Sequence, residues 1–372
     1  MDTVILTFPR HKFEIKDLSY FGTTRDLATN DPRGFAPYYN NPTPQEKREG
    51  IYMPVFSLYR RGRVWWLNVQ FSVQKLLFGN SADEAEETDF EPSIKKLQEC
   101  LQRRSIQIED QDIRDASPIA IHPAKNIIIG DGYRSIFVVS ELSKVNLTEK
   151  LEMDRKQYKN NGHALQYYSK AHALVIYDKK ADNRKSTSRA IEEDRMPQQL
   201  SLFKELNKKH LLPEILRIEV RLCDKTKMNQ VLKKLGYSIN PTFKDVFKKD
   251  LWQKVVQMYW QHFVAEKNLF LYDMTSGPQA SIRKIIRNNT TIKPKQAIYQ
   301  AGILALARDQ EGIRGMRKEL SAICDRRTWY RIADDFKPLN KSQKIIDCHS
   351  WVRDIENQLR DFKSYKLPKF DV

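Results

Sequence analysis

Two short segments carry side chains that could perform chemistry on phosphodiesters. Tyr177 and Lys179 end an apolar run, and strand alternation would place both on one face. In the second segment Arg217, Glu219 and Arg221 alternate with aliphatic residues, so the charged groups share a face. A tyrosine attacks phosphorus when a cation stabilises its phenolate, a carboxylate can hold a metal ion, and arginines neutralise phosphate. The two segments therefore predict tyrosine-dependent transfer of a nucleic-acid strand.

Simpler interpretations of the same residues remain open. Tyr177 could be a half-buried tyrosine at the end of a strand. The charged face of the second segment could be the solvated face of an edge strand with internal ion pairs. Asp182 follows shortly after Lys179 and could orient the lysine or assist proton transfer.

Histidine supplies a candidate metal ligand. His122 directly follows the predicted strand Ser117–Ile121, where its imidazole could bind a divalent ion together with Glu219, or could merely cap the strand. His172 lies five residues before Tyr177, so alternation places it on the opposite face unless a bulge intervenes. We therefore rank His122 ahead of His172 as a ligand.

Composition restricts the class of partner. The 372 residues carry a net charge of +17, which favours an anionic partner, nucleic acid first and a membrane surface second. No run of about 18 apolar residues is present, so we expect no membrane span. The four cysteines lack metal-ligand spacing and are typical of reduced thiols in the cytoplasm. No glycine-rich phosphate loop is present, which argues against a nucleotide cofactor.

Short β-branched and aromatic runs predict strands throughout the first half of the chain. They are Val4–Phe8, Tyr52–Tyr59, Val64–Phe71, Ser117–Ile121, Ile127–Ile129, Ile136–Val139, Ala173–Tyr177 and Ile215–Leu222. Apolar residues at helical spacing predict helices at Pro92–Arg103 and Lys225–Leu235, the second capped by Asp224. This mixture predicts the α+β class, with an antiparallel sheet and helices packed on it.

Two polar segments are expected to be surface loops. Gly79–Pro92 is acidic, and Asn183–Gln199 is rich in charge. Because Asn183–Gln199 follows the Tyr177 strand directly, it could instead form a lid over the site.

After Pro241 the pattern becomes helical, so we divide the chain into a sheet domain, residues 1–242, and a smaller helical domain, residues 243–372. Within the second, Ile313–Leu320 and Arg326–Phe336 have the proportions of a helix-turn-helix. Arg327 and Arg331 would share one side of its second helix and could reach phosphates or guanine edges. An ordinary amphipathic helix pair in a bundle would give the same pattern.

Taken in order, these segments resemble the replication initiators of filamentous bacteriophages, the gene II type nickases, and related phage and plasmid proteins. The resemblance covers most of the chain and rests on several segments in sequence. These are Met1–Pro9, Ser72–Asn80 with Lys75, Tyr177–Lys179 with Asp182, Arg217–Arg221, Asp250–Lys254 and the arginine-rich segment near Trp329. Lys75 is expected to contact DNA.

The resemblance implies a site-specific protein that nicks and rejoins DNA to start rolling-circle replication. Tyr177 matches the tyrosine that becomes joined to the 5′ end of the nicked strand, and Lys179 matches the lysine after it. Asp182 and Glu219 match acidic positions. His122 stands where several members carry an aspartate in an Arg-x-Asp strand, and would replace it as a metal ligand.

The resemblance also implies a set of partners. The cofactor would be Mg²⁺ or Mn²⁺, and a histidine ligand favours Mn²⁺. The substrate would be origin DNA, with Arg217 and Arg221 spreading the developing charge, and the host helicase and polymerase would act next in the bacterial cytoplasm. The alternative is a non-enzymatic regulator that binds an operator through its C-terminal helices, reversibly and without metal.

Overall fold

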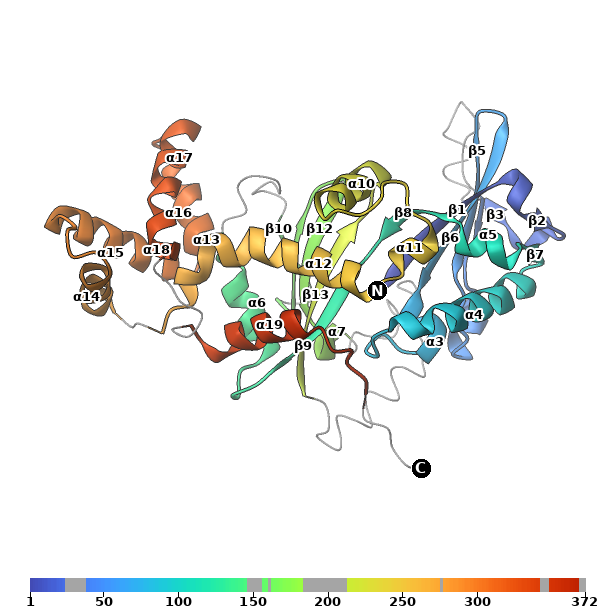
Figure 1. Ribbon diagram of the computed structural model, residues 1–372, viewed down its shortest axis with the longest axis horizontal. Helices are drawn as coiled ribbons and strands as arrows, with labels where there is room; N and C mark the ends of the chain where they lie inside the picture. The colour runs from blue at the N-terminus through green and yellow to red at the C-terminus, as the bar shows by residue number, and fades with distance from the viewer. Residues whose placement is uncertain are drawn as a thin grey trace.

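The computed structural model describes residues 1–23, 38–145, 156–159, 162–182, 213–274, 277–341 and 348–367. The predicted loop Asn183–Gln199 lies outside these residues. Figure 1 shows an elongated molecule with a large sheet at its centre and a group of C-terminal helices, residues 278–341, at one end. Among the described residues, no helix combines the length and the apolar character needed to cross a bilayer.

The sheet joins eleven described strands in the order β10-β11-β12-β13-β8-β1-β6-β5-β4-β3, with β9 paired to β13, and the pairings are antiparallel. Its strands are β1 (Thr3–Pro9), β3 (Gly22–Thr23), β4 (Tyr38–Asn40), β5 (Val55–Arg61), β6 (Val64–Ser72), β8 (Ser117–Ile121), β9 (Ala124–Ile129), β10 (Lys156–Lys159), β11 (Ala164–Tyr168), β12 (His172–Asp178) and β13 (Glu214–Leu222). A small second sheet pairs β2 (Glu14–Ile15) with β7 (Ile106–Gln107). The predicted α+β class is confirmed.

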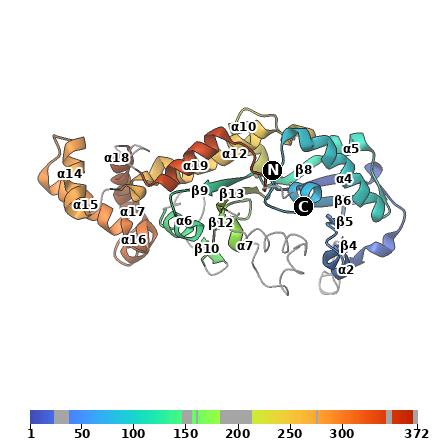
Figure 2. The same ribbon diagram turned by 90° about the horizontal axis from the view of Figure 1, so that it is seen from below.

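Helices cover one face of this sheet. Those nearest to it are α3 (Val73–Phe78), α4 (Phe90–Arg103), α5 (Asp110–Arg114), α6 (Ser135–Leu142), α10 (Lys225–Lys234), α11 (Phe243–Val246), α12 (Lys249–Trp260) and α19 (Ser350–Asp361). In Figure 2, helices α4, α10, α12 and α19 lie on one side of the strands, whereas the short helix α7 (Lys179–Asp182) lies on the other. The other described α-helices are α2 (Pro44–Arg48), α13 (Glu266–Asn268), α14 (Pro278–Asn288), α15 (Pro294–Arg308), α16 (Gly312–Leu320), α17 (Arg326–Asp334) and α18 (Phe336–Lys341).

The alternation of β13 decides which of its side chains face the helices. Ile218 and Val220 are fully buried among the apolar residues of the helix-covered face. Successive side chains of a strand point to opposite faces, so Arg217, Glu219 and Arg221 must project from the face away from helices α10, α12 and α19. The amphipathic pattern of one strand thus decides where the charged cluster lies.

A kinked strand connects the two halves of the sheet. β8 pairs with β1 along one edge, and after His122 and Pro123 the chain continues as β9 along β13. The carbonyl of Pro123 accepts a hydrogen bond from the Val220 N–H at 2.9 Å, and the His122 N–H donates to the Thr3 carbonyl at 2.8 Å. The kink therefore holds His122 between β1 and β13.

Helix α19 satisfies the outer edge of β9. The side-chain amide of Gln358 accepts from the Ile128 N–H at 2.8 Å and donates to the Ile128 carbonyl at 2.7 Å, as a neighbouring strand would. Asp354 accepts from the Gly130 N–H at 2.9 Å. Exposed strand edges favour unwanted pairing with other chains, so this helix protects the sheet as well as packing on it.

Several elements differ from those that the sequence predicts. Ile136–Val139 lies within helix α6 and is not a strand, because a short apolar run fits a buried helix equally well. The strand predicted from Tyr52 begins at Val55. The segment Gly79–Pro92 is not simply a surface loop: Glu84 is 5% exposed within it, and helix α4 begins at Phe90.

The helices after residue 242 share the core of the sheet. The Phe243 ring lies 5.9 Å from that of Phe71 and 5.3 Å from that of Phe90, and Trp252 is buried in the same apolar cluster. The division into residues 1–242 and 243–372 stays a prediction, and the first helices of the second part pack as a continuation of the first.

We expect Gln358→Leu to lower the free energy of unfolding by about 1–2 kcal/mol, because two hydrogen bonds to the edge of β9 are lost. Urea denaturation measures the change. Arg353→Leu, at an exposed position on the same helix, is the control and should change stability by less than about 0.5 kcal/mol. Equal stability of the two variants would contradict the edge-protecting role.

Candidate functional site

The charged residues of β13 face a tyrosine on the neighbouring strand. In the register of β12 with β13, Tyr177 lies directly opposite Arg217, and Val175 lies opposite Glu219. Side chains that lie opposite or diagonally across an antiparallel pair are within reach of each other. The pairing of these two strands, rather than either strand alone, therefore assembles the cluster.

Tyr177, Glu219 and Lys179 meet at one point. The Tyr177 hydroxyl donates to Glu219 Oε2 at 3.4 Å, and Lys179 Nζ lies 3.5 Å from the same hydroxyl. Lys179 reaches it from helix α7, because β12 ends at Asp178 and the chain turns there. The predicted proximity of tyrosine and lysine is thus present, although Lys179 does not continue the strand.

Burial controls the protonation of this group. Tyr177 is 8% exposed, and burial raises the pKa of its hydroxyl well above its usual value, an effect that Arg217 partly opposes. Burial, followed by the charge of Arg217, lowers the pKa of Lys179 to about 8. The phenol is therefore protonated near neutral pH, and Lys179 exchanges its proton in the physiological range.

Glu219 is the centre of the cluster. Its Oε1 accepts from Arg221 Nε at 2.7 Å and lies 3.6 Å from His122 Nδ1, while its Oε2 accepts from Tyr177. Burial lowers the pKa of His122, an effect that the nearby Glu219 opposes, so the imidazole is neutral at pH 7. Since β13 lies between β12 and the kinked strand, the solvated edge-strand interpretation is wrong.

Arg217 has a different position from the one that the sequence suggests. Its side chain has no exposed surface, and Nη1 donates to the Ser81 carbonyl at 3.0 Å and to Asn126 Oδ1 at 3.2 Å. Nη2 donates to Gln74 Oε1 at 3.1 Å and lies 3.1 Å from Asp2 Oδ2. With its terminal nitrogens engaged inside the protein, the predicted phosphate contact of Arg217 is not supported. Arg221, whose side chain is 35% exposed, is the arginine that a phosphate can approach.

Asp2 completes this charged interior. Burial alone would raise the pKa of its carboxyl, but Arg217, then Lys179 and Lys75, lower the pKa below its usual range. Ser72 Oγ donates to Asp2 Oδ1 at 3.0 Å and also caps helix α3, which carries Lys75. Lys75 is thus placed close enough to the cluster to act on it electrostatically.

Two further candidate residues, Asp182 and His172, lie in different places. The charge of Asp182 adds to the rise that burial causes in the pKa of Tyr177 and opposes the fall that burial causes in the pKa of Lys179, so Asp182 is an electrostatic neighbour of the pair. His172 lies on the helix-covered face, where its Nδ1 is 2.7 Å from the Tyr259 hydroxyl. Strand alternation predicts this position, and His172 therefore does not join the metal site.

The donor set fits a divalent cation with two protein ligands. His122 presents a neutral imidazole and Glu219 a carboxylate, 3.6 Å apart, and Mg²⁺ sites commonly take one or two protein ligands and complete the shell with water and substrate phosphate. Within the described part of the chain, no group of three histidine, cysteine or acidic residues is arranged to hold a metal. A cation here would share Glu219 with Arg221.

The predicted helix-turn-helix elements are both helical. Helix α16 and helix α17 are joined by a short connection, and Trp329 is buried on α17. Arg327 and Arg331 are both exposed, as expected for side chains that face a nucleic acid, and also as expected for the outside of a bundle. Their role stays a prediction.

Sequence reasoning missed the residues that hold Arg217. Gln74, Asn126 and the Ser81 carbonyl come from segments distant along the chain, and each is an ordinary polar group in the sequence. Of the partners of Arg217, only Asp2 could have been suspected from the sequence, because it is an acidic residue just before the predicted strand Val4–Phe8. Pairing it with Arg217 would still have required the order of the strands.

Comparisons with protein-family models, with curated proteins and with solved structures found no significant match. The functional argument therefore depends on the site geometry and on the resemblance of the sequence segments.

We expect Arg217→Met to lower the free energy of unfolding by about 3–5 kcal/mol, because removal of one partner leaves buried acceptors and the Asp2 carboxylate unpaired. Thermal or urea denaturation gives the value. Arg327→Met, at an exposed arginine, should cost less than about 0.5 kcal/mol. A loss below about 1 kcal/mol for Arg217→Met would show that the buried guanidinium is not structural.

Proposed function

We propose that this protein is a tyrosine-dependent DNA nickase and strand-joining enzyme that initiates rolling-circle replication of a phage or plasmid. The observation that supports it best is the contact of the Tyr177 hydroxyl with both Glu219 and Lys179. A nucleophile, a proton acceptor and a cation within hydrogen-bonding reach are the parts that such a transfer needs. The resemblance to gene II type initiators supports the same assignment.

The chemical step transfers one phosphodiester bond to the protein. The Tyr177 oxygen forms a bond to phosphorus while the bond from phosphorus to the 3′ oxygen breaks. Glu219 Oε2, which already accepts the phenol hydrogen bond, is the nearest acceptor for the proton. The 3′ oxygen leaves, takes a proton and becomes the primer for the host polymerase. Because the ester keeps the bond energy, a later 3′ hydroxyl can reverse the step and close a circle without a nucleotide cofactor.

Cations balance the charge that develops during this transfer. Protonated Lys179 lies next to the phenol oxygen and stabilises it as it loses its proton. Arg221 is partly exposed beside Glu219 and is placed to meet the phosphate. When bound, Mg²⁺ or Mn²⁺ would be held by His122 and Glu219 and would polarise the phosphate. Because Tyr177 is 8% exposed, the phosphate reaches it only after a local rearrangement.

Tyr177→Phe should abolish a covalent protein–DNA adduct, since the ring stays but the attacking oxygen is lost. The assay incubates the protein with Mn²⁺ and labelled supercoiled origin DNA, and a denaturing gel separates the adduct. Tyr168→Phe is the matched control. Tyr168 lies on the neighbouring strand β11, on the same face of the sheet as Tyr177. An adduct that survives Tyr177→Phe and disappears with Tyr168→Phe would show that Tyr168, and not Tyr177, is the nucleophile.

The rate of adduct formation should fall as pH rises through 8. With a pKa of about 8, the charged fraction of Lys179 drops about tenfold between pH 7 and pH 9, while Tyr177 stays protonated over that range. Lys179→Arg keeps the charge and should flatten the profile. Initial rates of adduct formation, measured over this pH range, test the role of the charged lysine. A rate that increases with pH would instead make neutral Lys179 the proton acceptor.

A non-enzymatic DNA-binding regulator is the second candidate, favoured by the exposed positions of Arg327 and Arg331 on helix α17. The same gel assay separates the two functions. A regulator would bind DNA with and without metal and would leave no adduct in the wild-type protein.

A further inference from the structure

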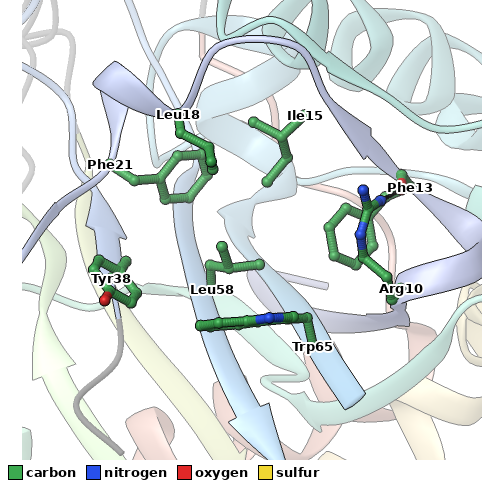
Figure 3. A pocket seen from close by; sticks show the side chains of 8 residues that line it. All are labelled: Arg10, Phe13, Ile15, Leu18, Phe21, Tyr38, Leu58 and Trp65. Carbon is green, nitrogen blue, oxygen red and sulfur yellow. Dashed lines mark hydrogen bonds between the residues drawn. The ribbon is translucent and has the colours of Figure 1, made fainter. Parts of the chain in front are cut away.

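A second feature lies at the far end of the sheet, where no residue of the proposed chemistry is found. A pocket of about 380 Å³ opens between strands β4 to β6 and the segment that follows β1. Figure 3 shows the residues that line it: Arg10, Phe13, Ile15, Leu18, Phe21, Tyr38, Leu58 and Trp65. Its volume is in the range of sites that take a small ligand or one part of a larger one.

Aromatic rings and an arginine define the inside of this pocket. In Figure 3, Tyr38 and Trp65 lie on one side and Leu18 and Phe21 on the other, with Arg10 at one end. The Tyr38 and Trp65 rings are 6.1 Å apart. Leu18 is 62% exposed and Tyr38 is 37% exposed, so this apolar surface is open to solvent. An exposed apolar hollow of this kind marks a binding site more often than a gap in packing.

A strongly basic hairpin stands beside the pocket. Strands β5 and β6 turn at Gly62, whose φ of +62° suits glycine, and the turn carries Arg60, Arg61 and Arg63. The three arginines are exposed and form no ion pair with another described residue. In the strand register Arg60 lies directly opposite Trp65, so its side chain shares the face that forms the pocket.

We propose that this pocket binds a base of single-stranded DNA, with the adjoining phosphates against the arginines of the β5–β6 hairpin. The inference rests on the proposed function for the nature of its ligand. Every base has a flat face that stacks on an aromatic ring, and single-strand sites combine such rings with a cationic track. An apolar peptide would fill the hollow equally well, but it would leave the arginines at the rim without a role.

The pocket is a subsite distant from the reacting bond. Strand β1 leads from Asp2, which contacts Arg217, to Arg10 in the pocket, and these eight steps of extended chain span about 26 Å. In the strand register Leu58 and Trp65 belong to the helix-covered face, whereas Tyr177 lies on the other face. A strand held at both places would therefore pass around the sheet and be fixed over several nucleotides. The pocket therefore adds affinity and position, whereas Tyr177 supplies the chemistry.

Binding of a fluorescent 20-nucleotide oligo-dT, followed by anisotropy, tests the proposal. Protein with Tyr177→Phe is used throughout, so that no covalent step contributes. Trp65→Leu keeps the pocket apolar and should weaken binding by about 5- to 150-fold, the loss of one stacked base. Phe137→Leu removes an aromatic residue that is 41% exposed and lies outside the pocket, and it should leave the affinity unchanged.

Charge and stacking are separated by two further measurements. Arg60→Gln should reduce the slope of log affinity against log salt concentration by about 0.7, whereas Trp65→Leu should leave that slope unchanged. An abasic strand of the same length retains its phosphates but has no bases, so Trp65→Leu should not affect its binding. Photocrosslinking of oligo-dT that carries iodouracil should label Trp65 or Tyr38.

The proposal is overturned if Trp65→Leu binds oligo-dT as tightly as its parent while unfolding at the same temperature. It is also overturned if Trp65→Leu weakens the abasic strand equally, because the residue then supports the fold and not a base. Failure of the nickase proposal has a different signature: no adduct forms with intact Tyr177, yet the effect of Trp65→Leu on oligo-dT persists.

Discussion

The buried guanidinium of Arg217 is the constraint on which the site depends. Transfer of such a charge out of water costs several kcal/mol, and only a full set of acceptors offsets that cost. The acceptors are supplied by the start of β1, helix α3, the loop at residue 81 and strand β9. Four separate segments must therefore be in place before the two terminal nitrogens of this side chain have their acceptors, and the same segments surround the reactive face.

The Glu219 carboxylate has three partners at once. The carboxylate is shared by a phenol, a guanidinium and an imidazole, and each occupies a different direction around it. A rigid central strand flanked on both sides keeps those directions fixed, which is how a site avoids reorganisation during reaction. The cations Arg217, Arg221 and Lys179 outnumber the carboxylates Glu219 and Asp2, so a phosphate enters a pre-arranged positive field at the Arg221 side.

The sequence alone was enough to predict which side chains of β12 and β13 share a face, because successive side chains alternate between the two faces of a strand. The predicted proximity of Tyr177 and Lys179 is present, although Lys179 lies in helix α7 and not in the strand. The sequence could not reveal the partners of Arg217, which depend on strand order. It also misjudged Gly79–Pro92: acidity indicates exposure, whereas Glu84 is buried in a pair with Lys125, 2.7 Å away and from a distant strand.

The end of the described chain holds a loop next to the site. The Tyr365 N–H donates to Glu84 Oε2 at 2.8 Å, and the Leu367 N–H donates to Asp83 Oδ1 at 2.6 Å, beside the Ser81 carbonyl that accepts from Arg217. Segments 281 and 284 positions apart along the sequence thus contribute to one framework. Loss of residues 365–367 would remove both ties, so a change far from Tyr177 in the sequence would loosen the loop that holds Arg217.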